Sequence, residues 1–302
     1  MNQNLTNLFV SGVGAHTYRI PSLISLGSGI LLCFAQGKLA GGGDRDASHV
    51  FSRLSLDRGQ SWSPARQALP LGGEVDNSTM YAQQALYNNL TGTVFLIYNK
   101  MPLDALCGAC VTYVVESTDR GASWSTGRPV ATSNATWGSG LASGVLLASG
   151  RLVLARRHDC DDCSGTPQAF VIISDDNGKS WKAGAMLPRG WTECDVAELR
   201  NGSLVLTARA LFGPNPPFPG PRLFARSDDG GESWARLWAD CKGEDQKLCD
   251  LPDPTCEASM IGDPKKSGRS KAAPYWDRHR PVPWPHSWNH APLSVDHLQP
   301  TM

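Results

Sequence analysis

Two arginines and two acidic residues of this 302-residue chain suit, by type, a site that binds an acidic ligand. Arg19 lies in the segment Tyr-Arg-Ile-Pro and Arg209 in Thr-Ala-Arg, whereas Asp44 follows three glycines and Glu193 precedes a cysteine. A guanidinium binds a carboxylate through two parallel hydrogen bonds and keeps its charge, and a carboxylic acid can transfer a proton. Because these residues are far apart in the sequence, the fold must bring them together.

An internal repeat predicts how the chain folds. The pattern Ser-x-Asp-x-Gly-x-Ser-Trp occurs four times, beginning at Ser55, Ser117, Ser174 and Ser227. In each copy a glycine that opens a β-rich apolar run stands 24 to 26 residues before the serine, at Gly29, Gly92, Gly150 and Gly202. Asp-x-Gly between two such runs is typical of a hairpin turn, in which the aspartate accepts backbone N–H groups and the glycine supplies a positive φ. We therefore interpret the aspartates of the repeat as turn residues: Asp57, Asp119, Asp176 and Asp229.

The spacing of the repeat indicates the architecture. Successive copies begin 62, 57 and 53 residues apart, which matches one four-stranded sheet per repeat, and few stretches show a helical period. Radial repetition of such sheets is a β-propeller. Gln36 and Arg209 each stand seven residues after the glycine of their repeat, so we expect equivalent strand ends to line one rim of the propeller.

Three segments resemble the sialidase family. Residues 18–21 are similar to its Tyr/Phe-Arg-Ile-Pro motif. Residues 32–46 are similar to its Ala-Phe-Ala-Glu-x-Arg run and the loop that follows this run. Residues 192–209 are similar to its stretch Glu-Cys-Gln-x-x-Glu-Leu-x-Asp-Gly-Ser-x-x-x-Asn-Ala-Arg. The resemblance covers residues 8–264 and is closest to the lysosomal type of animal sialidase. It implies an all-β six-bladed β-propeller with Asp-box repeats, whose last blade is incomplete here.

The resemblance also implies roles for individual residues. Arg19 and Arg209 would bind the carboxylate of sialic acid, Asp44 would act as acid and base, and Glu193 would activate a nucleophilic tyrosine, the nucleophile that distinguishes sialidases from most glycosidases. Asp46 is the alternative to Asp44. Structural alternatives also exist, namely a surface salt bridge for Arg19 and an ion pair between Glu193 and Arg209.

Some positions depart from the family pattern. Gln36 stands where the family has glutamate, and Lys38 stands where it has arginine. Lysine keeps the positive charge but lacks the planar fork, and we expect Lys38 to contact the substrate. Arg269 falls where the third carboxylate-binding arginine would stand. The nucleophilic tyrosine has no counterpart, because Tyr275 in Ala-Pro-Tyr-Trp does not fit the family's segment.

The resemblance fades after residue 264. We therefore predict a propeller domain over residues 1–264 and an aberrant or disordered tail over residues 265–302, which is rich in proline, tryptophan and histidine. A truncated or mis-spliced C-terminus would explain this tail.

Composition narrows the range of partners. The formal net charge is zero and the isoelectric point is about 7.0, so no basic surface points to nucleic acid. The apolar run from Ile20 to Ala35 is interrupted by proline and glycine and lacks the roughly 20 apolar residues of a membrane span. Two Cys-x-x-Cys pairs could supply four thiolates to zinc, but loop disulfides explain them as well. We expect sialylated glycans as partners, with no metal and no cofactor.

The compartment is predicted from the asparagines. Five Asn-x-Ser/Thr sequons favour a lysosomal or secretory lumen, although no secretory signal opens the chain. The cytoplasm or a membrane-associated location is the alternative.

The sequence thus predicts an exo-α-sialidase, a glycoside hydrolase that removes terminal sialic acid from glycoproteins, oligosaccharides and gangliosides. The alternative is a catalytically impaired propeller that binds sialic acid, because the tyrosine nucleophile is missing. A third hypothesis is an Asp-box propeller that serves as a protein-interaction module.

Overall fold

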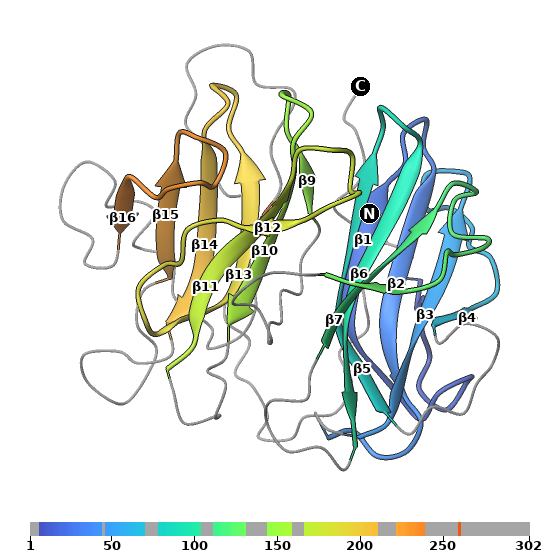
Figure 1. Cartoon of the computed structure of the whole chain (residues 1–302). Helices are drawn as coiled ribbons and strands as arrows, with labels where there is room; N and C mark the ends of the chain where they lie inside the picture. Colours follow the sequence, from blue (N-terminus) through green and yellow to red (C-terminus); the bar gives the residue numbers. More distant parts are fainter. Residues whose placement is uncertain are drawn as a thin grey trace, which may run out of the picture.

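The computed structural model describes residues 6–43, 46–69, 78–103, 111–130, 144–158, 166–210, 222–238 and 259–260. Every regular element in these ranges is a β-strand, and the strands form four antiparallel units that we call sheets 1 to 4 (Figure 1). The predicted all-β class is confirmed. Among the described residues, no helix is long and apolar enough to cross a membrane.

Each sheet is built from four consecutive strands. Sheet 1 contains β1 (Thr17–Ser25), β2 (Leu31–Lys38), β3 (Ser48–Ser55) and β4 (Arg66–Leu69), and sheet 2 contains β5 (Ser78–Asn88), β6 (Thr93–Pro102), β7 (Val111–Ser117) and β8 (Arg128–Pro129). Sheet 3 contains β9 (Val145–Leu146), β10 (Leu152–His158), β11 (Gln168–Ser174) and β12 (Lys182–Ala183), and sheet 4 contains β13 (Trp191–Glu198), β14 (Leu204–Ala210), β15 (Leu223–Ser227) and β16 (Arg236–Trp238). Sheets 1 and 2 are joined by one parallel bridge between Ser48 and Thr79.

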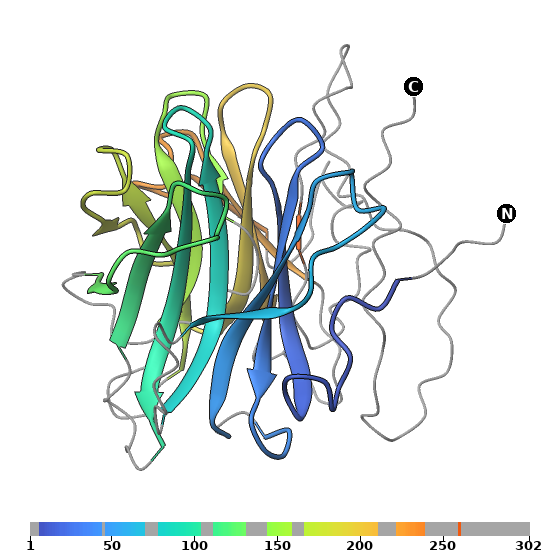
Figure 2. The ribbon, with the colours of Figure 1, turned by 90° about the vertical axis from the view of Figure 1, so that its right-hand side faces the viewer.

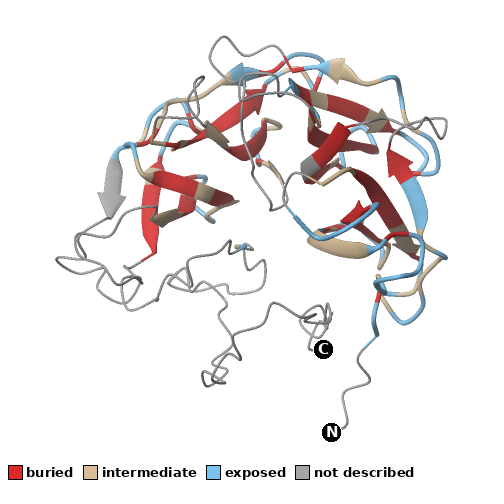
Figure 3. Cartoon of the chain, turned by 90° about the horizontal axis from the view of Figure 1, so that it is seen from below, coloured by how far each residue is buried: buried red, intermediate tan, exposed pale blue. Residues whose placement is uncertain are grey.

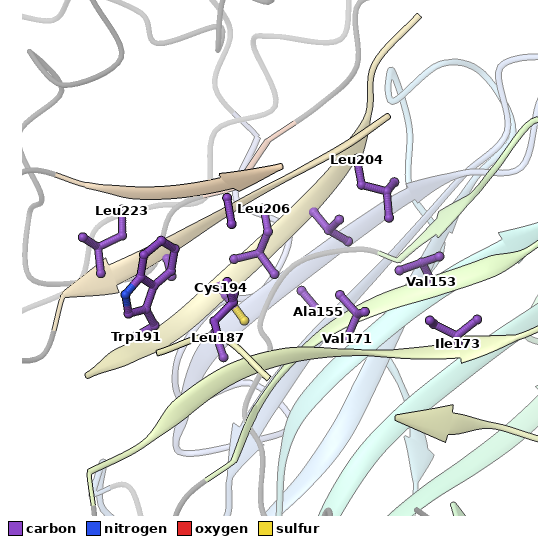
Figure 4. Packing of buried hydrophobic residues seen from close by; sticks show 14 of the residues in the cluster. Val153, Ala155, Val171, Ile173, Leu187, Trp191, Cys194, Leu204, Leu206 and Leu223 are labelled. Carbon is purple, nitrogen blue, oxygen red and sulfur yellow. The ribbon is translucent and has the colours of Figure 1, made fainter. Parts of the chain in front are cut away.

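The sheets stand face to face around an arc (Figure 3). Alternate side chains of a strand point to opposite sides. The central strands are apolar at successive positions, so both of their faces are apolar. In β10, Leu152 and Leu154 pack toward sheet 2, whereas Val153 and Ala155 pack toward sheet 4. Three buried clusters fill the three interfaces between neighbouring sheets, and Figure 4 shows the one between sheets 3 and 4. Hydrophobic burial between sheets therefore holds the fold together.

The repeated serine–aspartate–glycine motif forms the turn between the third and fourth strands of each sheet. In sheet 1 the Ser55 hydroxyl accepts the Gly59 N–H at 2.8 Å, and the Asp57 carboxylate accepts the N–H and hydroxyl of Ser61 at 2.8 and 2.5 Å. Arg58 and Gly59 adopt φ values of 63° and 84°. The equivalent hydrogen bonds recur in the other three sheets.

These turns also connect neighbouring sheets. The carbonyl of the turn glycine accepts a hydrogen bond from the preceding sheet in three cases: Arg66 donates to Gly121, Arg128 donates to Gly178, and the Ala185 N–H donates to Gly231. A donor from one sheet thus secures the turn of the next.

The hairpins between the first and second strands all lie at the upper edge of the molecule in Figure 2. The first strand of every sheet therefore begins, and the second strand ends, toward the opposite edge, which we call the lower edge.

Several predictions concern residues outside the described ranges. The domain boundary at residue 264, the tail and both Cys-x-x-Cys pairs lie there. Cys33, by contrast, is described and buried, and burial raises the pKa of its thiol to about 12.

Candidate functional site

Glu193 lies in a β-bulge at the lower edge of sheet 4. The register of β13 against β14 shifts between Trp191 and Cys194, so that the bulged segment faces Arg209. Similar shifts occur at the matching place in β1, after Arg19, and in β5. Bulges re-aim side chains and are common beside functional sites. Here the bulge places an acidic side chain opposite an arginine.

The Glu193 carboxylate is held between two arginines from neighbouring sheets. Arg209 Nη1 lies 3.1 Å from Glu193 Oε2, and Arg157 Nη1, from β10 of sheet 3, lies 4.0 Å from Glu193 Oε1. The exposed fractions of these side chains are 18% for Glu193, 28% for Arg209 and 25% for Arg157. The cluster is partly open to solvent, and the charges of these three side chains sum to one positive charge, which favours an anionic ligand.

The main chain at Glu193 rests on buried polar groups. Arg222 is fully buried, and its guanidinium donates to Thr207 Oγ1 at 3.1 Å and to the Glu193 carbonyl at 3.4 Å. Asp195 is also buried and accepts the N–H groups of Val196 at 2.7 Å and Met260 at 2.5 Å. Burial raises the pKa of Asp195 to about 7, although both N–H groups and the Arg222 charge act in the opposite direction.

At the lower edge of sheet 1, two cations secure the loop that follows β2. Arg19 Nη1 donates to the Gly42 carbonyl at 3.3 Å. Lys38 is fully buried, and its ammonium donates to the Asp46 carbonyl at 3.1 Å. Asp44, the predicted acid and base, is between these two attachment points in sequence but outside the described residues.

Gln36 and Asp46 take part in local hydrogen bonds. The buried Gln36 amide donates to Ser48 Oγ at 2.9 Å and to the Met80 carbonyl at 3.0 Å, which ties sheet 1 to sheet 2. The Asp46 carboxylate accepts the Gly43 N–H at 2.7 Å within the loop. Glutamine at position 36 thus supplies an amide donor at this junction.

The predicted site residues fall into two groups. Glu193 and Arg209 are in contact in sheet 4, whereas Arg19 and Lys38 lie in sheet 1. All four residues lie at the lower edge, either near the beginning of the first strand or near the end of the second strand of their sheet (Figure 2). Arg269 lies outside the described residues, and the roles of all six predicted residues stay predictions. Within the described ranges, no cluster of three or more His, Cys, Asp or Glu side chains could hold a metal ion.

Sequence reasoning missed Arg157 and Arg222. Arg157 stands seven residues after Gly150, the same offset as Arg209 from Gly202, so the repeat carried a signal for it. Arg222 has no comparable signal, because its contact with the Glu193 carbonyl depends on how β14 and β15 pair.

The four-stranded sheets repeat along the chain and share one kind of turn. Residues 29–266, which contain most of these repeats, match the family model described as "BNR repeat-like domain". A sialidase from Micromonospora viridifaciens is 28% identical over 274 residues, which cover 82% of this chain and 39% of that protein. Human Sialidase-4 is 28% identical over 286 residues, covering 82% of this chain and 54% of that protein. The chain therefore belongs to the sialidase family, and it spans about half the length of these relatives or less.

Solved structures show the same fold. The Hadza microbial sialidase Hz136 superposes with a TM-score of 0.69 at 23% identity, covering 82% of this chain and 50% of that one. The NanB sialidase of Streptococcus pneumoniae superposes with a TM-score of 0.66 at 16% identity, covering 78% of this chain and 54% of that one. These sialidases are β-propellers, and the four sheets correspond to part of such a fold.

Proposed function

We propose that this protein is an exo-α-sialidase that hydrolyses terminal sialic acid. The observation that carries the proposal is that Arg19, Glu193 and Arg209, which are far apart in the sequence, lie at strand ends on the same lower edge, where Glu193 and Arg209 stay partly open to solvent (Figure 2). Sialic acid carries a carboxylate, and the planar fork of an arginine matches it. In the proposal Arg19, Arg209 and Arg269 bind that carboxylate. Lys38 was expected to contact the substrate, but it is fully buried and holds the loop after β2 through the Asp46 carbonyl instead.

The proposed chemistry follows the family mechanism for a retaining glycosidase. Asp44 protonates the departing glycosidic oxygen, and Glu193 accepts the proton of a tyrosine whose phenolate attacks the anomeric carbon. Asp44 then takes a proton from a water that attacks the same carbon, the bond from sugar to tyrosine breaks, and Glu193 returns the proton to the tyrosine oxygen. A tyrosine suits this substrate, because its phenol is neutral until Glu193 takes the proton, whereas a carboxylate nucleophile would be repelled by the carboxylate of the sugar. Glu193 needs a fixed orientation for this step, and the neighbouring guanidinium groups supply one.

The finer features belong to the same proposal. They are a six-bladed propeller with Asp boxes, substrates among glycoproteins, oligosaccharides and gangliosides, and a lysosomal or secretory compartment. The repeated turns support the Asp-box propeller, and the sequons support the compartment.

A fluorogenic sialoside tests the proposal. The purified chain should release the fluorophore, and Glu193→Gln should lose most turnover while still binding sialic acid. Glu116→Gln is a matched control, because Glu116 pairs with Arg128 in sheet 2, away from Glu193. Equal turnover by the wild type and Glu193→Gln would refute the assigned role.

The sequence also favours a second function, sialic-acid binding without hydrolysis. Tyr275 is the tyrosine that follows Glu193 in this sequence, and its surroundings do not resemble the family's nucleophile segment. Calorimetry with free sialic acid separates the two functions. Binding without turnover supports the second function, turnover supports the first, and the lack of both contradicts each of them.

A further inference from the structure

Arg157 and Arg209 occupy the same position in neighbouring sheets. In sheet 3 Leu152 pairs with the turn serine Ser174, and in sheet 4 Leu204 pairs with Ser227. Each arginine stands five residues after that leucine. The second strands of both sheets therefore deliver a guanidinium to the lower edge at the same level.

Arg157 contacts two residues of the bulge of sheet 4. Its Nη1 donates to the buried Thr192 hydroxyl at 3.4 Å and lies 4.0 Å from Glu193 Oε1. Arg209 contacts the other carboxylate oxygen, Oε2. Each oxygen of Glu193 thus faces an arginine from a different sheet.

This arrangement restricts the motion of the carboxylate. The terminal torsion of a glutamate is broad and roughly two-fold, so a single contact at Oε2 leaves the other oxygen able to move. A second positive charge at Oε1 opposes that rotation, and partial burial keeps the attraction effective at 4.0 Å. The Thr192 contact also fixes the bulge, where the regular strand pairing is interrupted.

The strand that carries Arg157 is itself firmly attached. The preceding residue, Arg156, is fully buried and donates to Gln84 Oε1 at 2.9 Å and to Asn99 Oδ1 at 2.5 Å in sheet 2. Its carbonyl accepts the Cys194 thiol of sheet 4 at 3.2 Å. The end of β10 is thus tied to both neighbouring sheets and offers a rigid base for Arg157.

We propose that Arg157 is a positioning residue for the reaction, which holds the Glu193 carboxylate from the neighbouring sheet in the orientation needed for proton transfer. The role in the reaction rests on the proposed function, whereas the coupling between Arg157 and Glu193 does not.

The activity test uses Arg157→Met and Arg157→Lys. Arg157→Met should lower kcat at least about tenfold, because misplacement of a catalytic group is costly, and KM should change much less. Arg157→Lys retains the charge and should lose only part of kcat. Arg226→Met is the matched control, because Arg226 pairs with Asp228 at the opposite edge of sheet 4.

A double-mutant cycle tests the coupling without any need for turnover. The thermal shifts caused by Arg157→Met and Glu193→Gln should be non-additive when the two changes are combined. An additive cycle, or an unchanged kcat of Arg157→Met in an active enzyme, overturns the proposal. An inactive wild type with a non-additive cycle contradicts the proposed function but retains Arg157 as the residue that holds Glu193. If Arg157→Met does not fold, Arg157→Lys replaces it in the cycle and should give a smaller coupling of the same sign.

Discussion

Arg209 illustrates how much depends on the shape of one side chain. Its guanidinium reaches Glu193 with Nη1 and remains 28% exposed, so it can serve an anionic ligand and the glutamate together. A lysine ammonium would supply the same charge as a single point.

We therefore predict that Arg209→Lys weakens the binding of free sialic acid by on the order of tenfold, which corresponds to one lost charge-assisted hydrogen bond of about 1.5 kcal/mol. Calorimetry measures the affinity. Arg226→Lys serves as the control, since its partner Asp228 lies at the opposite edge. Unchanged affinity in Arg209→Lys would show that this guanidinium does not bind the ligand.

Asp195 provides a prediction about pH. Burial raises its pKa from the ordinary value of 3.8 to about 7, so the folded state keeps the proton at pH values where the unfolded chain has lost it. The contribution of Asp195 to stability is therefore greatest below about pH 4 and decreases as the pH rises toward 7.

Asp195→Asn cannot ionise and should abolish this decrease in the free energy of unfolding between pH 4.5 and 7.5, as measured with urea. Asp228→Asn is the control. Hydrogen bonds from Ser203 and Arg226 lower the pKa of Asp228, so its titration in the folded state falls below this interval. A persistent decrease in Asp195→Asn would assign the pH dependence to other groups.

At the scale of elements, the repeated turn depends on glycine at the junction between sheets. Gly178 has a φ of +86°, and a Cβ atom there would lie 2.3 Å from Phe95 Cε1 of sheet 2. Phe95 in turn packs edge-on against Trp181, with ring centroids 6.2 Å apart. The glycine thus permits both the turn and the packing of two sheets.

Gly178→Ala should lower the free energy of unfolding by at least about 2 kcal/mol, because backbone strain and overpacking add. Gly202→Ala is a matched comparison, since its φ is +83° and nothing lies within 4 Å of an added Cβ. That variant should lose only about 1–2 kcal/mol. Equal losses in urea unfolding would show that the contact with Phe95 is unimportant.

The elements also show how far sequence reasoning reaches. The four hairpin turns could be predicted, because Asp57 and Gly59 and their equivalents form local hydrogen bonds that their own types dictate. The bulges could not, because Ile20 and Pro21 share no residue type with Thr192 and Glu193. A bulge depends on the register of two strands, and no single position marks it.

The candidate site was predictable to a similar extent. Glu193 and Arg209 were both selected by a family motif, whereas their ion pair was expected only as the structural alternative to their family roles. The burial of Lys38 and the approach of Arg157 depend on contacts between strands or sheets that are remote in sequence. Such contacts become visible only when the sheets are assembled.

At the scale of the whole molecule, each sheet packs against its neighbours through a separate buried cluster and a turn. The four turn aspartates Asp57, Asp119, Asp176 and Asp229 all have a pKa lowered to about 2. In the first three the hydroxyl and N–H of the serine four residues later are the main cause, whereas at Asp229 the same bonds overcome an opposing effect of burial. All four turns therefore respond to acid together.

These opposite shifts predict a maximum of stability at mildly acidic pH. The turn aspartates stabilise the fold above about pH 4, and their contribution is lost as the pH falls toward 2, whereas the contribution of Asp195 decreases as the pH rises toward 7. The melting temperature should therefore peak between about pH 4 and 5 and fall on both sides. Asp119→Asn should weaken the dependence on the acid side alone, and Asp195→Asn should flatten the neutral side alone. Calorimetric scans from about pH 2.5 to 8 measure both limbs, and a melting temperature that rises steadily to pH 7 would contradict the assignment of the neutral limb to Asp195.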